Sequence, residues 1–232
     1  AVNIDKLYIR PFSKEDFVIE SSIRPDILGA WDISGRINVV DNSFDLNVSC
    51  NELPITENIS NMLRNDYKKQ FESFSPHGII GINISVNSNG QDNNLNYNAV
   101  LNLKNVYLKP DVFPFLTNVT GIIQINRDNL DIINLNVKKD ILNVVFNGRI
   151  TDYAKEPYGS IDVAVKNLSL ENDVKNLIDK NLPEDIMSKL NDLTINGTID
   201  VETKISIYKG HDLLKNINKE GILNSIDKFV LK

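Results

Sequence analysis

The sequence has few of the residues that catalytic and metal centres use. It contains one cysteine, Cys50, and two histidines, His77 and His211, in 232 residues. A single cysteine excludes an internal disulfide framework and a structural zinc site built on several thiolates. Cys50 has the apolar parity of its surroundings and is expected to be a small buried residue. The two histidines lie in turn-like contexts, where surface or capping roles are expected.

The usual catalytic signatures are also missing. There is no Gly-x-Ser-x-Gly, no P-loop and no Gly-x-Gly-x-x-Gly motif. Adjacent acids such as Glu15–Asp16 and Glu184–Asp185 stand where turns or helices would start, and there carboxylates favour the helix dipole. Spacing alone leaves a glycosidase carboxylate pair open, but nothing singles one out. We therefore expect a protein that is not an enzyme and needs no metal and no cofactor.

Charge and hydropathy restrict the partners. The net charge is −6, which argues against a nucleic-acid partner, because phosphate grooves need clustered Lys and Arg. No apolar run approaches the ~20 residues of a membrane span. The opening stretch AVNIDKLYIRPFS is not a signal peptide. We expect the chain to be an excised part of something longer.

The chain repeats itself. ILGAWDISGRI and ILNVVFNGRI share Ile-Leu at one end and Gly-Arg-Ile at the other, with Gly35 and Gly148 placed 113 positions apart. The surroundings also recur in the same order, which predicts one continuous domain with repeat 1 at about 7–105, repeat 2 at about 106–207 and a C-terminal helical tail or cap at 208–232. The other landmark pairs are LYIRP (7–11) with VYLKP (106–110), FDLNVSCNELPI (44–55) with GSIDVAVKNLSL (159–170), the helical patterns that follow these, and HGIIGINISV (77–86) with LTINGTIDV (193–201).

Most of the chain alternates apolar and polar residues. From Ile80 to Asn87, for example, every second residue is Ile or Val and the residues between are Gly, Asn or Ser. This period predicts strands with one dry and one wet face, roughly a dozen in all. Short turn-forming breaks between them predict an antiparallel meander. Helical spacing is confined to Glu57–Phe74, Glu171–Leu190 and His211–Leu231.

The expected fold is therefore mainly β with a few helices. A long antiparallel sheet with one apolar face must protect that face, at ~25 cal/mol per Å² of apolar surface. It can close into a sandwich, be covered by helices, or curl into a long curved groove lined by apolar residues, with helical excursions between strands. The alternation leaves these three outcomes open.

The second half of the chain contains a characteristic series of stretches. In order, they are the Phe-Pro step at Phe113–Pro114, LTNVTGIIQI (116–125), LDIINLNV (130–137), FNGRI (146–150), VKNLSLENDV (165–174) and LTINGTID (193–200).

This arrangement resembles the AsmA-like and TamB-like envelope proteins of bacteria with two membranes. The resemblance covers nearly the whole chain, with Gly35 to Val86 as a poorer copy. It implies a repeating β-groove that carries phospholipid or other acyl-chain lipids between the inner and outer membranes, or serves envelope biogenesis. It further implies a periplasmic location, an inner-membrane anchor outside this sequence, and contacts with further repeats and envelope proteins.

The candidate groove lining consists of residues with apolar strand parity. The same lining would also suit a closed, dry, sandwich-like core, so a non-catalytic structural or assembly scaffold that binds a protein partner is the alternative. Trp31 fits either interpretation. The proposed lipid-binding residues are Trp31, Ile33, Ile37, Leu46, Val48, Ile82, Ile84, Tyr97, Leu101, Ile123, Ile125, Ile132, Val144, Phe146, Val163, Val165, Ile199 and Val201.

Overall fold

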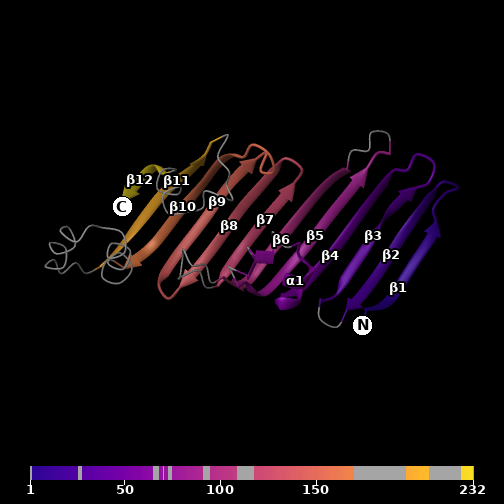
Figure 1. Cartoon of the computed structure of the whole chain (residues 1–232), viewed down its shortest axis with the longest axis horizontal. Helices are drawn as coiled ribbons and strands as arrows, with labels where there is room; N and C mark the ends of the chain where they lie inside the picture. Colours follow the sequence, from indigo (N-terminus) through magenta and orange to yellow (C-terminus); the bar gives the residue numbers. More distant parts are fainter. Residues whose placement is uncertain are drawn as a thin grey trace.

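The computed structural model shows one long antiparallel sheet (Figure 1). It describes residues 2–25, 28–64, 68–69, 71–72, 75–90, 95–108, 118–169, 197–208 and 226–231. Twelve strands follow one another across the sheet in sequence order, so each strand pairs with the next one along the chain. This confirms the predicted mainly β meander. The strands are β1 (Val2–Pro11), β2 (Asp16–Pro25), β3 (Trp31–Asn38), β4 (Phe44–Ile55), β5 (His77–Ser88), β6 (Leu95–Tyr107), β7 (Val119–Asn126), β8 (Asn129–Lys139), β9 (Leu142–Thr151), β10 (Tyr158–Ser169), β11 (Thr198–Ile207) and β12 (Ile226–Leu231).

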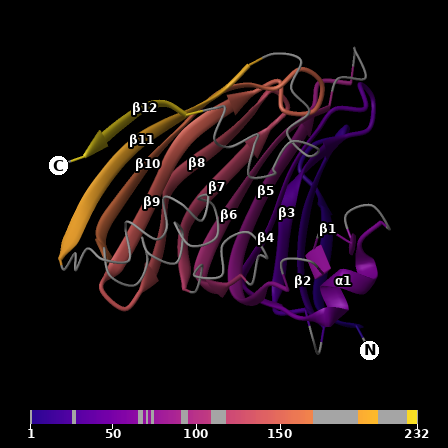
Figure 2. The same cartoon turned by 60° about the vertical axis from the view of Figure 1, so that its left-hand side comes forward.

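The sheet is open and curved. Its order begins at β1 and ends at β12, which are its two edge strands. It twists and bends along its length (Figure 2). All twelve strands belong to this sheet, so the described residues form no second sheet that could close a sandwich. The strand ends form two borders of the sheet. We call the border where the odd-numbered strands end the tip edge. The opposite border carries helix α1 (Glu57–Met62), and we call it the helix edge.

Bulges on the even-numbered strands keep the apolar residues on one face. The register shifts between Cys50 and Leu53 in β4, and between Leu103 and Val106 in β6. At each bulge, successive apolar residues are three positions apart on the bulged strand and two positions apart on its partner. The extra residue returns the next apolar side chain to the same face. A bulge also bends its strand and increases the local twist, which accounts for the curvature. The corresponding shifts in β8 and β10 are Ile132 to Leu135 and Val165 to Leu168.

Asparagine provides the backbone conformation at several of these bulges. Asn105, Asn134 and Asn167 have φ values of 54°, 47° and 57°. This left-handed region is costly for most residues, whereas Asn is tolerated there because its short side chain bonds locally. The abundance of Asn thus has a structural use in this sheet.

The sequence landmarks fall on the strands as follows. Gly35 lies in β3 and Gly148 in β9, each against the backbone of the next strand, Asp45 and Ser160 respectively, so a side chain would clash there. The bulges of β4 and β10 occupy matching positions, because Leu53 pairs with Ile80 and Leu168 pairs with Ile199. By strand, β1–β6 therefore correspond to β7–β12. LYIRP lies in β1 but Val106 and Tyr107 end β6, so this pair of stretches does not occupy corresponding strands.

The helical predictions have a mixed outcome. Within Glu57–Phe74, α1 covers Glu57–Met62 and residues 68–69 and 71–72 are again helical. Glu171–Leu190 lies outside the described residues. The helix predicted over His211–Leu231 is wrong at its end, because Ile226–Leu231 forms β12. Without β12, the outer edge of β11 would leave backbone N–H and C=O groups without partners. Residues Ile226–Leu231 pair with this edge as an antiparallel strand and add their apolar side chains to the sheet.

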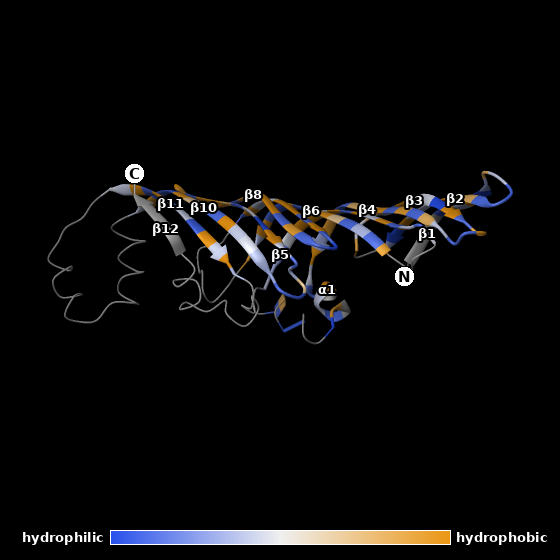
Figure 3. Ribbon diagram, turned by 90° about the horizontal axis from the view of Figure 1, so that it is seen from above, coloured by the Kyte–Doolittle hydropathy of each residue, from blue (hydrophilic) through white to orange (hydrophobic). Residues whose placement is uncertain are grey.

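The buried residues mark one face of the sheet. At the helix edge, Ile55, Val106, Val119 and Val137 form a buried cluster, and Ile59 of α1 packs against it. Seen from above, α1 stands off one side of the sheet (Figure 3). That side is therefore the apolar one, and α1 covers only part of it.

Candidate functional site: an apolar face on a single layer

The strand register defines an apolar face. Directly opposite residues in an antiparallel pair point to the same side of the sheet. One line of paired residues runs from β4 to β12, and all its members are apolar except Gly148. We call it the central row: Cys50, Ile82, Leu101, Ile123, Ile132, Gly148, Ile161, Ile205 and Ile226.

A second row runs beside the central row, two residues closer to the tip edge. It extends from β3 to β11 and is again apolar apart from one glycine. The alternating colours along the strands in Figure 3 follow from this separation of apolar and polar residues. The second row consists of Ile33, Val48, Ile84, Ala99, Ile125, Leu130, Ile150, Gly159 and Ile207.

The register places all eighteen predicted lining residues on this face. Only Val163 and Val201 are buried, with 8% and 5% exposure, and the other sixteen are half-buried. Within the described residues, Ile59 of α1 packs on this face at the helix edge, and the Leu28 carbonyl oxygen lies 4.0 Å from Cys50 Sγ. That the eighteen lining residues contact a lipid remains a prediction.

The sequence-based lining omitted the most buried part of the face. Val106, Val119 and Val137 have exposures of 3%, 1% and 3%. Val106 and Val137 follow the bulges of β6 and β8, where the period-two pattern changes parity. The signal that could have found them is a three-residue step between apolar residues with an Asn inside it.

The helix edge combines this cluster with polar groups. A cavity of about 600 Å³ lies between α1 and the start of β5, with Ile55, Ser60, Glu72 and His77 in its wall. Ser60 is 5% exposed, and its hydroxyl donates to a Glu72 carboxylate oxygen at 3.0 Å. The cavity therefore joins a polar wall to the apolar cluster.

His77 and Cys50 have separate structural surroundings. The His77 ring stacks on Tyr107 with centroids 4.9 Å apart, and the residue is exposed. Cys50 is 1% exposed, which confirms the expected small buried residue. Its Sγ lies 4.0 Å from the Leu28 carbonyl oxygen. His211 lies outside the described residues.

A tyrosine pair closes part of the tip edge. The hydroxyls of Tyr97 in β6 and Tyr153 in the β9–β10 turn are 2.6 Å apart. The Asp152 amide donates to the Asp128 carbonyl oxygen at 2.6 Å, which ties this turn to the β7–β8 turn between them. Burial, followed by the hydrogen bond to Tyr97, raises the pKa of Tyr153 to about 12. Tyr153 therefore stays protonated at neutral pH, and the two hydroxyls form a polar border to the apolar face.

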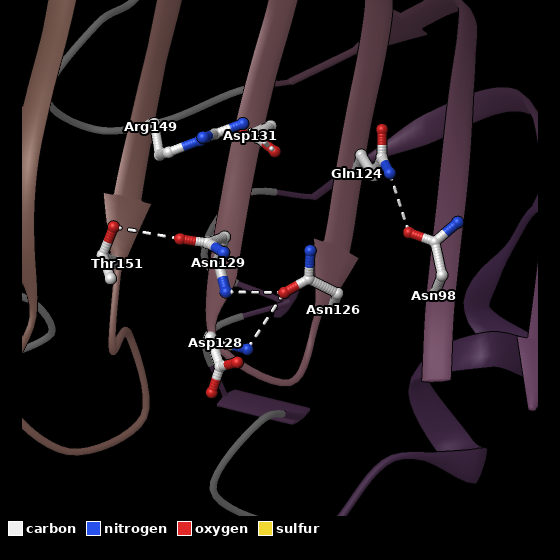
Figure 4. A network of polar contacts seen from close by, with 8 residues as sticks. All are labelled: Asn98, Gln124, Asn126, Asp128, Asn129, Asp131, Arg149 and Thr151. Atoms are coloured by element: carbon white, nitrogen blue, oxygen red, sulfur yellow. Dashed lines mark hydrogen bonds and ion pairs between the residues drawn. The ribbon is translucent and has the colours of Figure 1, made fainter. Parts of the chain in front are cut away.

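The opposite face is mainly polar, and hydrogen bonds between its side chains link neighbouring strands (Figure 4). Gln124 Nε2 donates to Asn98 Oδ1 at 2.8 Å, and Thr151 Oγ1 donates to Asn129 Oδ1 at 3.0 Å. In the β7–β8 turn, Asn126 Oδ1 accepts from the Asn129 amide at 2.8 Å. Side-chain amides can donate and accept at once, so they suit such ladders.

One ion pair joins β8 and β9 on the polar face. Arg149 Nε and Nη2 lie 2.5 and 3.2 Å from the two carboxylate oxygens of Asp131 (Figure 4). The hydrogen bond and charge of Asp131 raise the pKa of Arg149 above its ordinary value. The ion pair and the hydrogen bonds between side chains thus link neighbouring strands on this face.

Other kinds of site find no support in the part of the chain that the structure describes. There, no three His, Cys, Asp or Glu side chains gather so as to hold a metal ion. Among the described helices, none has the length and apolarity that crossing a membrane requires.

The fold and the site define the class of protein: an open, single-layer antiparallel sheet with one apolar and one polar face. Searches of family models, curated proteins and solved structures find no match to this chain.

Proposed function

We propose that the chain is a lipid-binding groove module of an AsmA-like envelope protein. It would hold phospholipid or other acyl-chain lipids in the periplasm, in transport between the inner and outer membranes or in envelope biogenesis. The observation that carries this proposal is the central row, an apolar line that crosses nine strands with no polar side chain in it. In this role the protein is not an enzyme and uses no cofactor.

The dimensions of the central row suit acyl chains. Eight strand spacings of ~4.8 Å give it a length of about 38 Å. An acyl chain occupies about half of a ~30 Å hydrocarbon core, so the row can hold two chains end to end. A site for one specific small molecule would carry a few placed polar groups. The row carries none, which favours flexible chains over a single shaped ligand.

The experiment compares two neighbouring isoleucines on opposite faces. Ile132 lies in the central row, and the next residue, Ile133, lies on the polar face with 38% exposure. Binding of a fluorescent fatty acid is titrated with wild type, Ile132→Asn and Ile133→Asn. We expect Ile132→Asn to weaken binding and Ile133→Asn to leave it unchanged, because an amide desolvated by an acyl chain lacks a hydrogen-bond partner.

A third variant tests obstruction without polarity. Ala99 is the smallest residue of the second row apart from Gly159, and it lies between Ile84 and Ile125. Ala99→Phe should reduce acyl-chain capacity by occupying the face, while the fold persists because the face is open. Equal binding by wild type and all three variants would contradict the proposal.

The scaffold alternative has one observation in its favour. On edge strand β1, Leu7 and Ile9 are 56% and 61% exposed. An exposed apolar edge can pair with a strand of another repeat or partner. A lipid-free chain that assembles through β1, measured by light scattering with and without Ile9→Lys, would support the scaffold function.

A further inference from the structure

Strongly exposed apolar side chains occur at two neighbouring turns of the tip edge. Among the described large hydrophobic residues, Val40 and Phe12 have the highest exposures, 67% and 65%, and Val39, next to Val40, is 54% exposed. Phe12 lies in the β1–β2 turn, and Val39 and Val40 lie in the β3–β4 turn. We call these three residues the tip patch.

Hydrogen bonds fix the two turns to each other. The Val39 amide donates to the Glu15 carbonyl oxygen at 2.9 Å, and Asn38 Nδ2 donates to Asp16 Oδ1 at 3.1 Å. The Val40 amide donates to Asn38 Oδ1 at 2.9 Å. These hydrogen bonds hold the two turns in a defined conformation in which the three apolar side chains are exposed.

A row of the apolar face lies next to these turns, whereas the Phe12 ring lies beside Arg36 of the polar face. The row nearest to these turns pairs Pro11 with Phe17, Phe17 with Ile37, and Ile37 with Phe44. We call it the entry row. All four residues are apolar, so the row of the apolar face nearest to the two turns carries no polar side chain.

The charges around the tips are of both signs. Lys14, Glu15 and Asp41 lie in the same two turns, and the Arg36 guanidinium stands 4.3 Å from the centre of the Phe12 ring. This mixture lacks the cluster of Lys and Arg that recognises anionic lipid surfaces. Recognition through this corner must therefore depend on apolar contact, and an aromatic ring beside a cation suits the boundary between head groups and acyl chains.

We propose that the tip patch docks this protein onto a lipid bilayer, with Phe12, Val39 and Val40 inserted at the interface. Docked in this way, the entry row adjoins the acyl-chain region, and a lipid chain can pass along it onto the apolar face. The docking step stands on the tip patch alone, whereas the transfer step rests on the proposed function.

Vesicle flotation tests the docking step. The probe is a neutral phosphatidylcholine vesicle, and the variant is Phe12→Ser/Val39→Ser/Val40→Ser. Its control is Ile141→Ser, because Ile141 is 64% exposed in the β8–β9 turn at the helix edge. Wild type and Ile141→Ser are expected to bind vesicles, and the triple variant to lose at least about tenfold in affinity, since its apolar insertion is removed.

Salt separates the two modes of membrane binding. In about 1 M sodium chloride the Debye length is only ~3 Å, and we expect binding to persist. Binding that requires anionic lipid and disappears in salt would overturn the inference, as would vesicle binding by the triple variant equal to that of wild type.

A fluorescent label at a single substituted position tests docking even if the triple variant fails to fold. A nitrobenzoxadiazole dye on Val40→Cys should shift to the blue with vesicles, and the same dye on Ile141→Cys should not. Equal responses at both positions would reject tip docking. The triple variant should still bind fatty acid in solution, whereas Ile132→Asn should still bind vesicles. Failure of docking is thus distinguishable from failure of the proposed function.

Discussion

The same substitution at two valines distinguishes an open face from a closed core. Val119 and Val48 both lie on the apolar face, in β7 and β4. Val119 is 1% exposed inside the cluster that α1 covers, whereas Val48 is half-buried in the second row. Val→Ala removes the same two carbon atoms at each position and lowers β-propensity similarly. The difference between the two losses of stability therefore measures how completely other residues cover each valine.

The structure sets the expected magnitudes. At Val119 the lost transfer free energy is ~0.8 kcal/mol per carbon, and the surrounding Ile55, Val106 and Val137 leave a cavity, so we expect a loss of about 2–3 kcal/mol. At Val48, Val→Ala loses only part of that transfer free energy, because the side chain is half-buried, and it leaves no enclosed cavity. Its expected loss is below about 1 kcal/mol.

Urea unfolding followed by circular dichroism gives both values from the transition midpoints at constant m-value. A difference of at least about 1 kcal/mol between Val119→Ala and Val48→Ala supports the open face. Equal large losses would contradict an open face, because Val48 would then be packed as tightly as a core residue.

Two further predictions concern the borders and bends of the sheet. Burial and Tyr97 raise the pKa of Tyr153 from 10.0 to about 12, so its neutral form stabilises the fold fully below pH 10 and this contribution is lost as pH rises towards 12. Tyr153→Phe should show a smaller loss of stability across that window in urea titrations, and an unchanged loss would contradict this assignment. At Gly121, φ is +139° and an added Cβ would lie 2.6 Å from the Asn134 carbonyl oxygen, whereas Gly197 has φ +131° and nothing within 4 Å. Thermal unfolding should therefore show Gly121→Ala to be less stable than Gly197→Ala by about 1–3 kcal/mol, and equal stabilities would count against the close approach.

The sheet and its apolar face follow from local patterns. Alternation in stretches such as Ile80–Asn87 reports strand and face together, because a strand has period two. Short turns then imply pairing between successive strands. This is why every predicted lining residue reaches the same face without any knowledge of the tertiary structure.

The features that the sequence did not reveal depend on contacts between distant residues. Tyr97 and Tyr153 are 56 positions apart, and only the stacking order of the strands between them brings their hydroxyls together. The tail was misassigned because its apolar residues recur at near-helical spacing, whereas the edge of β11 selects an extended partner at Ile226–Leu231. The exposure of Phe12 and Val40 likewise depends on where the strands end.

Native mass spectrometry of protein purified from cells without detergent decides whether the apolar face holds lipid. We expect wild type to carry phospholipid or fatty acid, Ile132→Asn to carry much less, and Ile133→Asn to carry as much as wild type. A wild-type chain that is free of lipid, and that also fails to take up added acyl chains, would contradict a lipid-binding function.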